Sequence, residues 1–270
     1  MRELTSIKII SLLILSAFAL TLIYSCGGSN GNSFSSMREH AVHFRNGHIA
    51  LTKGNYELAE SEFKKAIDIY PDNAPYYNYL GLTYFLQKKY QTALKEFDKG
   101  LKINNAYGDI YNNRGLVYLE LGEEELALEE FKKALKIPSY PTPENAYFNI
   151  GRIHYMKERW VEAEFNFEKA LNSLEGKKRM QQPEILCYLS MSLMKQDKYS
   201  EALVHLKKAV KINPKYVLAH YNLGVVYYKL GVLSKAMNHF LEVRSITSIN
   251  DPMYKEVTEY INRIKEADQD

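Results

Sequence analysis

The sequence has little of what a disulfide-stabilised protein, a metalloprotein or a nucleotide-binding enzyme needs. Its 270 residues include two cysteines, Cys26 and Cys187, and contain no CxxC pair, no HExxH motif and no GxxxxGK loop. If Cys26 is modified, no internal disulfide can form. We therefore expect a non-enzymatic protein without a cofactor or a metal, whose fold is stabilised by apolar packing.

The charge balance gives no sign of a nucleic-acid partner. There are 35 basic and 32 acidic residues, and the longest basic run is 177–179. A nucleic-acid-binding domain more often has a basic stripe and a pI above about 9, whereas the pI here is about 8.5. Carboxylate runs such as Glu123–Glu125 are typical of solvated helix faces. We expect neither a nucleic-acid partner nor a small-molecule substrate.

Three histidines near the start of the repeat region are candidates for metal ligands. His40, His43 and His48 are separated by three and five positions. Residues three apart share a helix face but residues five apart do not, so one helix cannot present all three. We expect these histidines to be solvent-exposed or capping residues. His154 and His220 stand where other repeats have tyrosine, which favours a packing role.

The first 25 residues differ in character from the rest of the chain. Arg2 and Lys8 accompany a short polar start, and residues 9–23 are almost entirely apolar. This run is shorter than the roughly 20 residues of a membrane span, and it is typical of a secretory signal peptide over residues 1–25.

The end of this segment, Ile23-Tyr24-Ser25-Cys26, resembles the lipobox of bacterial lipoproteins. The resemblance implies cleavage before Cys26, which then carries palmitate or similar acyl chains. Because Gly27 is not an aspartate, it also implies sorting to the periplasmic face of the outer membrane. The alternatives are an uncleaved anchor, or a secreted protein in which this cysteine is incidental.

A linker is expected between the lipid and the folded part of the chain. Residues 26–38 are rich in glycine, serine and asparagine, and such a composition cannot bury apolar surface. About ten flexible residues reach roughly 17–19 Å. We expect a flexible tether over 26–38 that keeps the folded part close to the membrane.

One pattern recurs six times in the remaining sequence. A small residue is followed twelve positions later by alanine and, four positions after that, by a large apolar residue. The alanines are 34, 34, 36, 39 and 34 residues apart, and a period of this size predicts a stacked solenoid. The six sets are Gly47/Ala59/Phe63, Gly81/Ala93/Phe97, Gly115/Ala127/Phe131, Gly151/Ala163/Phe167, Ser190/Ala202/Leu206 and Gly224/Ala236/Phe240.

Each period contains two segments with helical spacing, joined by a short turn and often ended by proline, as at Pro71 and Pro214. These residues resemble the tetratricopeptide repeat, in which small residues let two helices approach and an aromatic ring fills the remaining space. The resemblance implies an all-α, right-handed superhelical solenoid of six repeats over residues 39–250. A capping helix and tail follow over 251–270.

Two joints interrupt the period. Residues 138–143 contain three prolines and predict a stiff, extended connection. Residues 173–182 are polar and predict a solvated loop. In the last segment, residues 253–264 place apolar side chains on one helix face and charged ones on the other, as the end of an open solenoid requires.

The first helices of the repeats are expected to line a groove that binds a protein partner. The residues at helical spacing that packing within a helix pair does not use are mostly apolar or aromatic, which is typical of a partner surface. Asparagines among them are suited to hydrogen-bond an extended peptide. The candidates are Phe44, His48, Leu51, Asn78, Leu82, Phe85, Asn112, Asn113, Leu116, Leu119, Phe148, Asn149, Arg152, Tyr155, Met191, Met194, Tyr221, Asn222, Val225 and Tyr228.

A lipobox, six repeats and two irregular joints together resemble the pilotin lipoproteins of type IV pilus systems, the Tgl/PilF/PilW family. Residues 140–151 are similar to the proline-broken start of that family's fourth repeat. The resemblance implies a lipid-anchored protein of the outer membrane that escorts secretin subunits and assists their assembly. The alternative is a general envelope adaptor for peptidoglycan enzymes or proteases.

Overall fold

The computed structural model describes residues 31–174 and 181–267, and describes side chains from Arg38 onward. Within these ranges the secondary structure consists of thirteen helices without a strand, which confirms the all-α fold. The signal segment 1–25, Cys26 and residues 175–180 of the second joint lie outside the described residues. The chain forms two compact units, residues 1–146 and 147–270.

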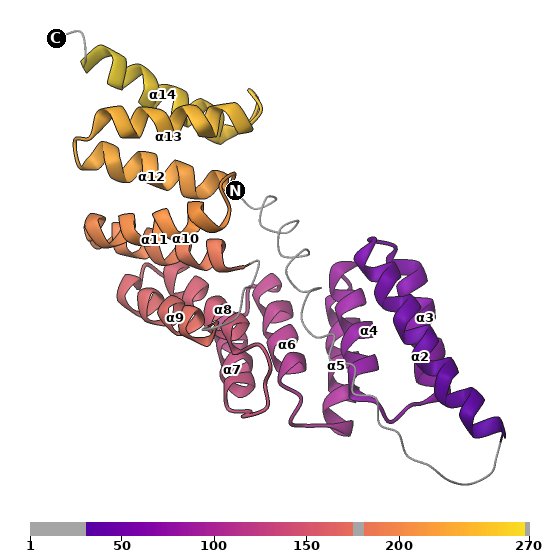
Figure 1. Ribbon diagram of the computed structural model, residues 1–270. Coiled ribbons are helices and arrows are strands. Elements are labelled where there is room, and N and C mark those ends of the chain that lie inside the picture. Colours follow the sequence, from indigo (N-terminus) through magenta and orange to yellow (C-terminus); the bar gives the residue numbers. More distant parts are fainter. Residues whose placement is uncertain (1–30, 175–180, 268–270) are drawn as a thin grey trace. The chain divides into compact units, whose positions relative to one another are not determined.

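From residue 31 onward, unit 1 contains three helix pairs in which each helix packs against the next (Figure 1). The first helices of successive pairs also touch, α2 with α4 and α4 with α6. Each pair is one of the predicted repeats. The helices are α2 (Gly31–Thr52), α3 (Tyr56–Ile69), α4 (Ala74–Leu86), α5 (Tyr90–Ile103), α6 (Gly108–Glu120) and α7 (Glu124–Leu135), followed by the first residues of α8 (Pro143–Met156).

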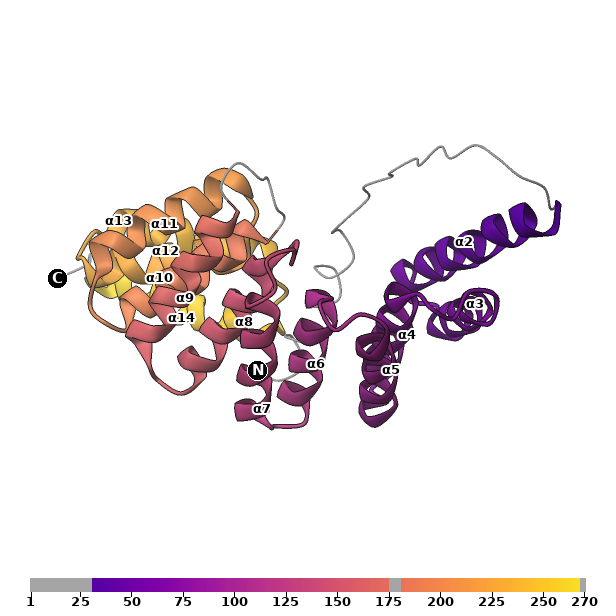
Figure 2. The same cartoon turned by 90° about the horizontal axis from the view of Figure 1, so that it is seen from below.

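Unit 2 repeats this arrangement with most of α8 and the six helices after it. From α9 to α14 each helix contacts the next, and α10 also contacts α12. The stacking of α10 to α14 is visible in Figure 1, and Figure 2 shows the same helices from below. The helices are α9 (Trp160–Ser173), α10 (Gln182–Met194), α11 (Tyr199–Ile212), α12 (Val217–Lys229), α13 (Leu233–Ile246) and α14 (Pro252–Ala267).

The last helix covers the end of the second unit. Val257, Ile261 and Ile264 of α14 are buried in the core of this unit, and Tyr260 stacks on Phe240 of α13 with ring centroids 4.7 Å apart. Its charged residues Lys255 and Glu259 are exposed. An apolar inner face with a polar outer face is what a terminal cap of a solenoid requires.

The tether expected over residues 26–38 differs from the structure in its second half. Helix α2 begins at Gly31, so residues 31–38 are helical, and only residues 26–30 of the expected tether lie outside the described part. Once a helix has a nucleus, each further residue adds one hydrogen bond. The helix of the first repeat therefore extends into a segment whose composition alone favours irregular backbone.

The small residues of the repeat are explained by one contact that recurs in both units. A methyl group placed on Gly115 would lie 2.5 Å from Cε1 of Phe131, and one on Gly81 would lie 2.6 Å from Cε1 of Phe97. Both phenylalanines are fully buried. The first helix must therefore lack a side chain where the ring of the second helix approaches. The same contact joins Gly47 to Phe63, Gly151 to Phe167 and Gly224 to Phe240.

The fifth repeat departs from this rule at both positions together. Ser190 replaces the glycine and Leu206 replaces the phenylalanine, and both side chains are fully buried. The Ser190 hydroxyl donates to the carbonyl oxygen of Leu186 at 2.6 Å, so this polar group is satisfied without water. Because Leu206 is smaller than the phenylalanine of the other repeats, there is room for the side chain of Ser190.

The turn within each helix pair requires a left-handed residue. Gly54, Gly122 and Gly231 have φ angles of 74°, 79° and 74°. The remaining three pairs place Lys88, Glu158 and Asp197 at this position, with φ angles of 60°, 58° and 58°. Since a side chain disfavours this conformation, the turn geometry is imposed by the packing of the helices and not by local preference.

The proline-rich joint of unit 1 is packed onto the fold. Tyr140 is buried with its ring against Gly108, where a methyl group would lie 2.6 Å from Cδ2 of the ring. Thr142 is buried as well, and its hydroxyl lies 3.5 Å from Oδ1 of Asp109. The joint predicted to be stiff thus places Pro141 and Thr142 beside the first turn of α6.

The Gly115–Phe131 contact can be tested by a double-mutant cycle. We expect Gly115→Ala to destabilise the protein by about 1–3 kcal/mol, because the added methyl group overpacks the ring. Combined with Phe131→Leu, which reproduces the fifth repeat, the two changes should be less costly than their sum by about 0.5–3 kcal/mol. Urea unfolding followed by circular dichroism measures these differences. Strictly additive effects on the free energy of unfolding would contradict the contact. So would a Leu206→Phe variant that retains Ser190 and is as stable as the wild type.

Candidate partner-binding site

The predicted groove residues divide into two groups by burial. Eleven are half-buried, whereas nine are buried, so for these nine the expectation of an exposed position in the groove is wrong. Leu51 and Leu82 show the reason, because both belong to the hydrophobic core of unit 1. The buried nine are Leu51, Asn78, Leu82, Asn112, Asn113, Leu116, Phe148, Asn149 and Asn222; the half-buried eleven are Phe44, His48, Phe85, Leu119, Arg152, Tyr155, Met191, Met194, Tyr221, Val225 and Tyr228.

Five of the predicted residues meet at one cavity of unit 1, with a volume of about 220 Å³. Ligand cavities for whole small molecules are generally larger, about 300–1,000 Å³, so this cavity has room for a side chain rather than for a cofactor. Sequence reasoning identified Phe44, Asn78, Leu82, Asn112 and Asn113. It missed Pro75, Tyr79, Tyr107, Asp109, Pro141 and Asn145, which complete the lining.

Amide groups from successive repeats meet in this cavity. The Asn113 amide of α6 donates to Oδ1 of Asn78 in α4 at 2.9 Å. An amide side chain has two donor hydrogens and a carbonyl oxygen that accepts two hydrogen bonds. The single hydrogen bond from Asn113 to Asn78 therefore fixes the orientation of the two side chains, and each amide can still form further hydrogen bonds.

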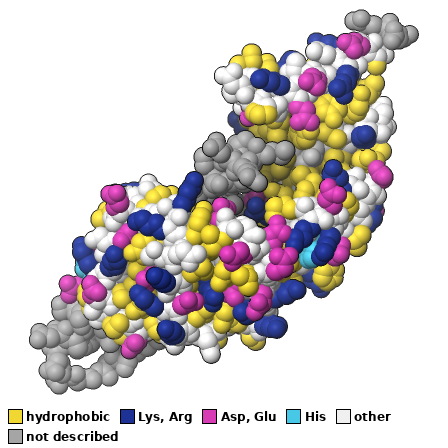
Figure 3. Space-filling view, turned by 180° about the vertical axis from the view of Figure 1, so that it is seen from behind, with side chains coloured by type: hydrophobic (Ala, Val, Ile, Leu, Met, Phe, Trp, Pro, Cys, Tyr) yellow, Lys and Arg dark blue, Asp and Glu magenta, His cyan; other side chains and the backbone are white. Residues whose placement is uncertain are grey.

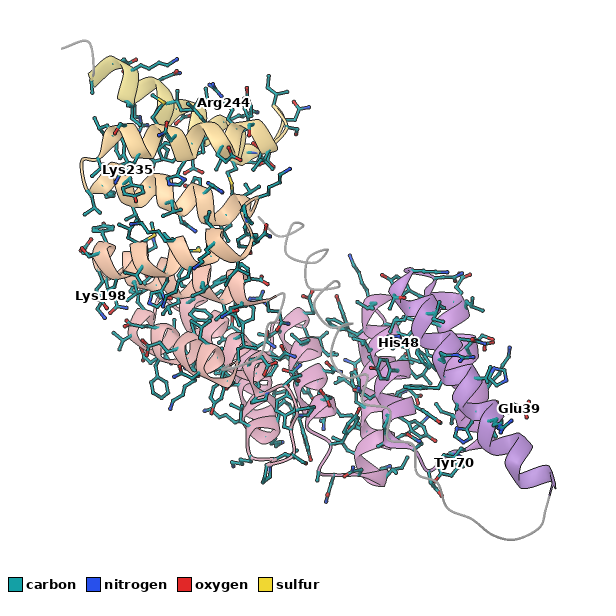
Figure 4. All side chains as sticks on the ribbon, in the orientation of Figure 1. Glu39, His48, Tyr70, Lys198, Lys235 and Arg244 are labelled. Atoms are coloured by element: carbon teal, nitrogen blue, oxygen red, sulfur yellow. The ribbon has the colours of Figure 1, made fainter. Side chains whose placement is uncertain are left out.

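Aromatic rings form the apolar side of the cavity. Phe44 of α2 contacts Tyr79 of α4 edge to face, with ring centroids 5.2 Å apart, and contacts Tyr76 at 4.8 Å. His48 extends this cluster, because its ring meets that of Tyr79 at 5.4 Å (Figure 4). Burial lowers the pKa of His48 and raises the pKa of Tyr79, so both side chains are neutral at pH 7.

Asp109 introduces the one carboxylate among the residues that line the cavity. It lies in the first turn of α6, where a negative charge is favourable. The pKa of Asp109 is nevertheless raised to about 6, chiefly by burial and to a smaller extent by the nearby Glu144, against hydrogen bonds from Thr142 and the backbone that lower it. Desolvation outweighs the favourable interactions, so the ionised carboxylate is under-solvated in its present surroundings.

The histidines near the start of the repeats connect helices and do not gather around a metal. Nδ1 of His43 lies 2.7 Å from Oε2 of Glu62 in α3, and Nδ1 of His40 lies 2.6 Å from the Tyr76 hydroxyl in α4. Both are half-buried, so the expectation of solvent-exposed histidines is wrong here. Within residues 31–174 and 181–267, no three His, Cys, Asp or Glu side chains are placed to hold a metal ion.

Unit 2 presents an apolar face made by its first helices. Figure 3 shows hydrophobic side chains gathered on the unit 2 surface toward the C-terminal end. Tyr155 meets Tyr188 edge to face at 6.1 Å, and Tyr228 meets Tyr260 of α14 at 5.2 Å. Met191 is half-buried on α10, as is Met194, and such flexible side chains adapt to a partner surface.

One asparagine of unit 2 differs from its counterpart in unit 1. Asn222 occupies the repeat position of Asn113, and it is 3% exposed, yet its Nδ2 has no hydrogen-bond partner in the described part of the chain. In unit 1 the acceptor for this position is Asn78, whereas the equivalent residue of the fifth repeat is the buried Cys187. A thiol is a weak acceptor, so the amide of Asn222 is left unsatisfied.

The half-buried carboxylate of Asp109 predicts a pH-dependent stability. The pKa of Asp109 rises from 3.8, the value of a solvated aspartate in the unfolded chain, to about 6 in the folded protein. The folded state therefore holds the proton more tightly, and stability falls as the pH rises through this window. We expect Asp109→Asn to be more stable than the wild type by about 1–3 kcal/mol at pH 7.5, and nearly equal in stability at pH 4. Urea unfolding at the two pH values measures this difference.

The matched control for this experiment is Asp68→Asn. Asp68 is an exposed acid on α3, so its replacement changes the net charge equally without relieving a buried group. We expect it to change stability by less than about 0.5 kcal/mol at either pH. An Asp109→Asn variant that is less stable than the wild type at pH 7.5 would show that the carboxylate is well solvated.

Comparison with protein families places the helix pairs in a known class. Models described as tetratricopeptide repeat match residues 41–73 and 72–139, and a model described as TPR repeat matches residues 192–231. Together these matches cover about half of the chain. Among curated proteins, none matches the sequence. Among the described helices, none has both the length and the apolar character needed to cross a membrane.

Solved structures share the fold over most of the chain. One is PilF of Pseudomonas aeruginosa, with a TM-score of 0.73 and 19% identity over 83% of this chain and 99% of that protein. PilW, described as a widely conserved type IV pilus biogenesis factor, has a TM-score of 0.66 and 19% identity over 85% and 100% of the two chains. YrrB, described as having an unusual peptide-binding site, has a TM-score of 0.56 and 21% identity over 73% and 97%. At these identities the likeness establishes the superhelical repeat fold.

Proposed function

The chain belongs to the tetratricopeptide-repeat family, and we propose that it is a pilotin: a lipid-anchored scaffold of the outer membrane that assists the localisation and assembly of a secretin. Tetratricopeptide-repeat proteins in general act as protein-interaction scaffolds rather than enzymes. The proposal adds the anchor, the membrane and the identity of the partner to this general role.

The observation that carries the proposal is the likeness to PilF and PilW over nearly their whole length. This chain covers both proteins almost completely, and PilW is described as a type IV pilus biogenesis factor. The lipobox-like Ile23-Tyr24-Ser25-Cys26 sequence adds an independent feature of lipoproteins. Neither feature alone distinguishes a pilotin, whereas the combination favours it over other scaffolds.

Anchoring and partner binding would act together. Acyl chains on Cys26 would hold the repeats at the inner leaflet of the outer membrane, and the repeats would bind one segment of each secretin subunit. Confinement to a surface raises the effective concentration of the bound subunits relative to one another. Assembly into a multimer is then favoured without any chemical step by this protein.

The anchor is tested by Cys26→Ala in a piliated host. We expect the variant to lose acylation and leave the outer-membrane fraction, and heat-resistant secretin multimers in that fraction to fall by at least about tenfold, because surface confinement is lost. Incorporation of labelled palmitate and immunoblots of separated membranes measure both quantities.

Cys187→Ala is the matched control, because it removes the other cysteine, which is buried in unit 2. It should retain acylation and secretin multimers. Undiminished outer-membrane multimers in Cys26→Ala would contradict the pilotin mechanism. Loss of anchoring without any effect on secretin would instead favour the general envelope adaptor, whose partners are then to be identified by cross-linking in intact cells.

A further inference from the structure

The cavity of unit 1 combines a carboxylate, aromatic rings and amides, and its lining includes no cationic side chain. Asp109 has Thr142 as its side-chain neighbour, with the two oxygens 3.5 Å apart, which is at the long limit of a hydrogen bond. The other lining residues are aromatic, aliphatic, proline or asparagine, and no lysine or arginine is among them. The charged side chain that acts on Asp109 is Glu144, which is also negative and therefore does not serve as a counter-charge.

The rings around this carboxylate are suited to a cation. Phe44, Tyr79 and Tyr107 all line the cavity together with Asp109. The face of an aromatic ring attracts an ammonium or guanidinium group, most strongly where water is excluded. A carboxylate in the same enclosure adds a charge-assisted hydrogen bond. The carboxylate disfavours an anion, and its charge gives a cationic side chain an advantage over an apolar side chain of the same length.

The size of the cavity limits what can enter it. Its volume of about 220 Å³ is below that of a typical small-molecule site and matches one long side chain. Asn78, Asn113 and Asn145 lie beside it, and their amides can bond the main chain on either side of an inserted residue. The surroundings therefore fit an extended peptide that inserts one side chain.

We propose that this cavity recognises a lysine or arginine side chain of an extended partner segment, with Asp109 as its counter-charge and Tyr79, Tyr107 and Phe44 as its aromatic wall. This inference rests on the proposed function as a protein-binding scaffold and names the chemistry of the bound segment. It assigns specificity to unit 1, whereas the apolar face of unit 2 supplies contact area.

Helix stabilisation by itself does not account for Asp109. An acidic residue in the first turn interacts favourably with the helix N-terminus while its carboxylate remains in water. Glu57 on α3 is such a residue, because its side chain is exposed. Asp109 is instead half-buried in a cavity whose hydrogen bonds do not offset the loss of solvation. A destabilising charge in a cavity is typical of a binding site.

The experiment uses the full chain, purified in detergent, and pools of N-acetylated, C-amidated decapeptides that fix lysine, arginine, norleucine or glutamate at one position. Norleucine approximates the length of lysine without its charge. At pH 7.5 we expect the lysine or arginine pool to bind at least about tenfold more tightly than the norleucine pool at one position. Fluorescence polarisation measures the affinities.

The expected signature of Asp109 is a loss of most of this preference without a change in the binding of norleucine. In Asp109→Asn the preference for lysine over norleucine should fall to the smaller part that the aromatic rings supply, while the norleucine pool keeps its wild-type affinity. Asp68→Asn should retain the full preference. As the pH falls from 7.5 to 5, the preference should also decline in the wild type. The titratable groups around Asp109 are Glu144 on α8, Tyr107 before α6, Tyr140 of the proline-rich joint, and Tyr79 on α4 with His48 beside it. The Asp109→Asn variant separates the titration of Asp109 from theirs.

Three results would overturn the inference. They are binding by no pool, equal binding by the cationic and norleucine pools, and a cation preference that is undiminished in Asp109→Asn. Each leaves the proposed function intact, because that function is judged by secretin multimers in the outer membrane after loss of Cys26. Conversely, a clear cation preference with undiminished multimers would retain this site and remove the pilotin role.

Discussion

In five of the six helix pairs, a phenylalanine ring of the second helix lies against a glycine of the first, with no space for a methyl group. This contact fixes how closely the two helices of a pair approach, because interiors as dense as this one cannot absorb an added atom without strain. The remaining pair, α10 and α11 of the fifth repeat, obeys the same constraint with Ser190 and Leu206, where a smaller side chain without a ring leaves room for a hydroxyl. The stacking of the pairs within each unit, and the surfaces they present, follow from it.

Because the framework repeats, the differences between repeats carry the specificity. The position three residues before the small residue is Phe44, Asn78 and Asn112 in unit 1, and Cys187 and Tyr221 in the last two repeats of unit 2. In unit 1, Asn78 at this position accepts an amide hydrogen bond and lines the cavity that contains the half-buried Asp109 carboxylate. In unit 2 it gives an apolar, aromatic face. The same fold thus offers two surfaces of different chemistry, which is suited to a scaffold that binds a segment with both charged and apolar parts.

The repeats are predictable from the sequence because the Gly, Ala and Phe positions are set by contacts within one repeat. The site is less predictable, because Asn78, Asn112 and Asn113 are buried by contacts between first helices of neighbouring repeats, which a single repeat does not reveal. The contribution of Asp109, Pro141 and Asn145 depends on where the proline-rich joint folds back, and Tyr140 against Gly108 fixes that position. Asp109 is not among the residues predicted from the sequence, because its place in the cavity and its desolvation are properties of the tertiary structure.

Entry of the partner into the cavity of unit 1 is the step on which recognition depends. Site-specific photo-cross-linking in intact piliated cells tests it directly, with benzoylphenylalanine at Asn145, which lines the cavity, and at Lys95, which is exposed on α5. If the partner enters the cavity, a secretin adduct forms from position 145 and none forms from position 95. Absence of the adduct at position 145, or equal adducts from both positions, would contradict this entry.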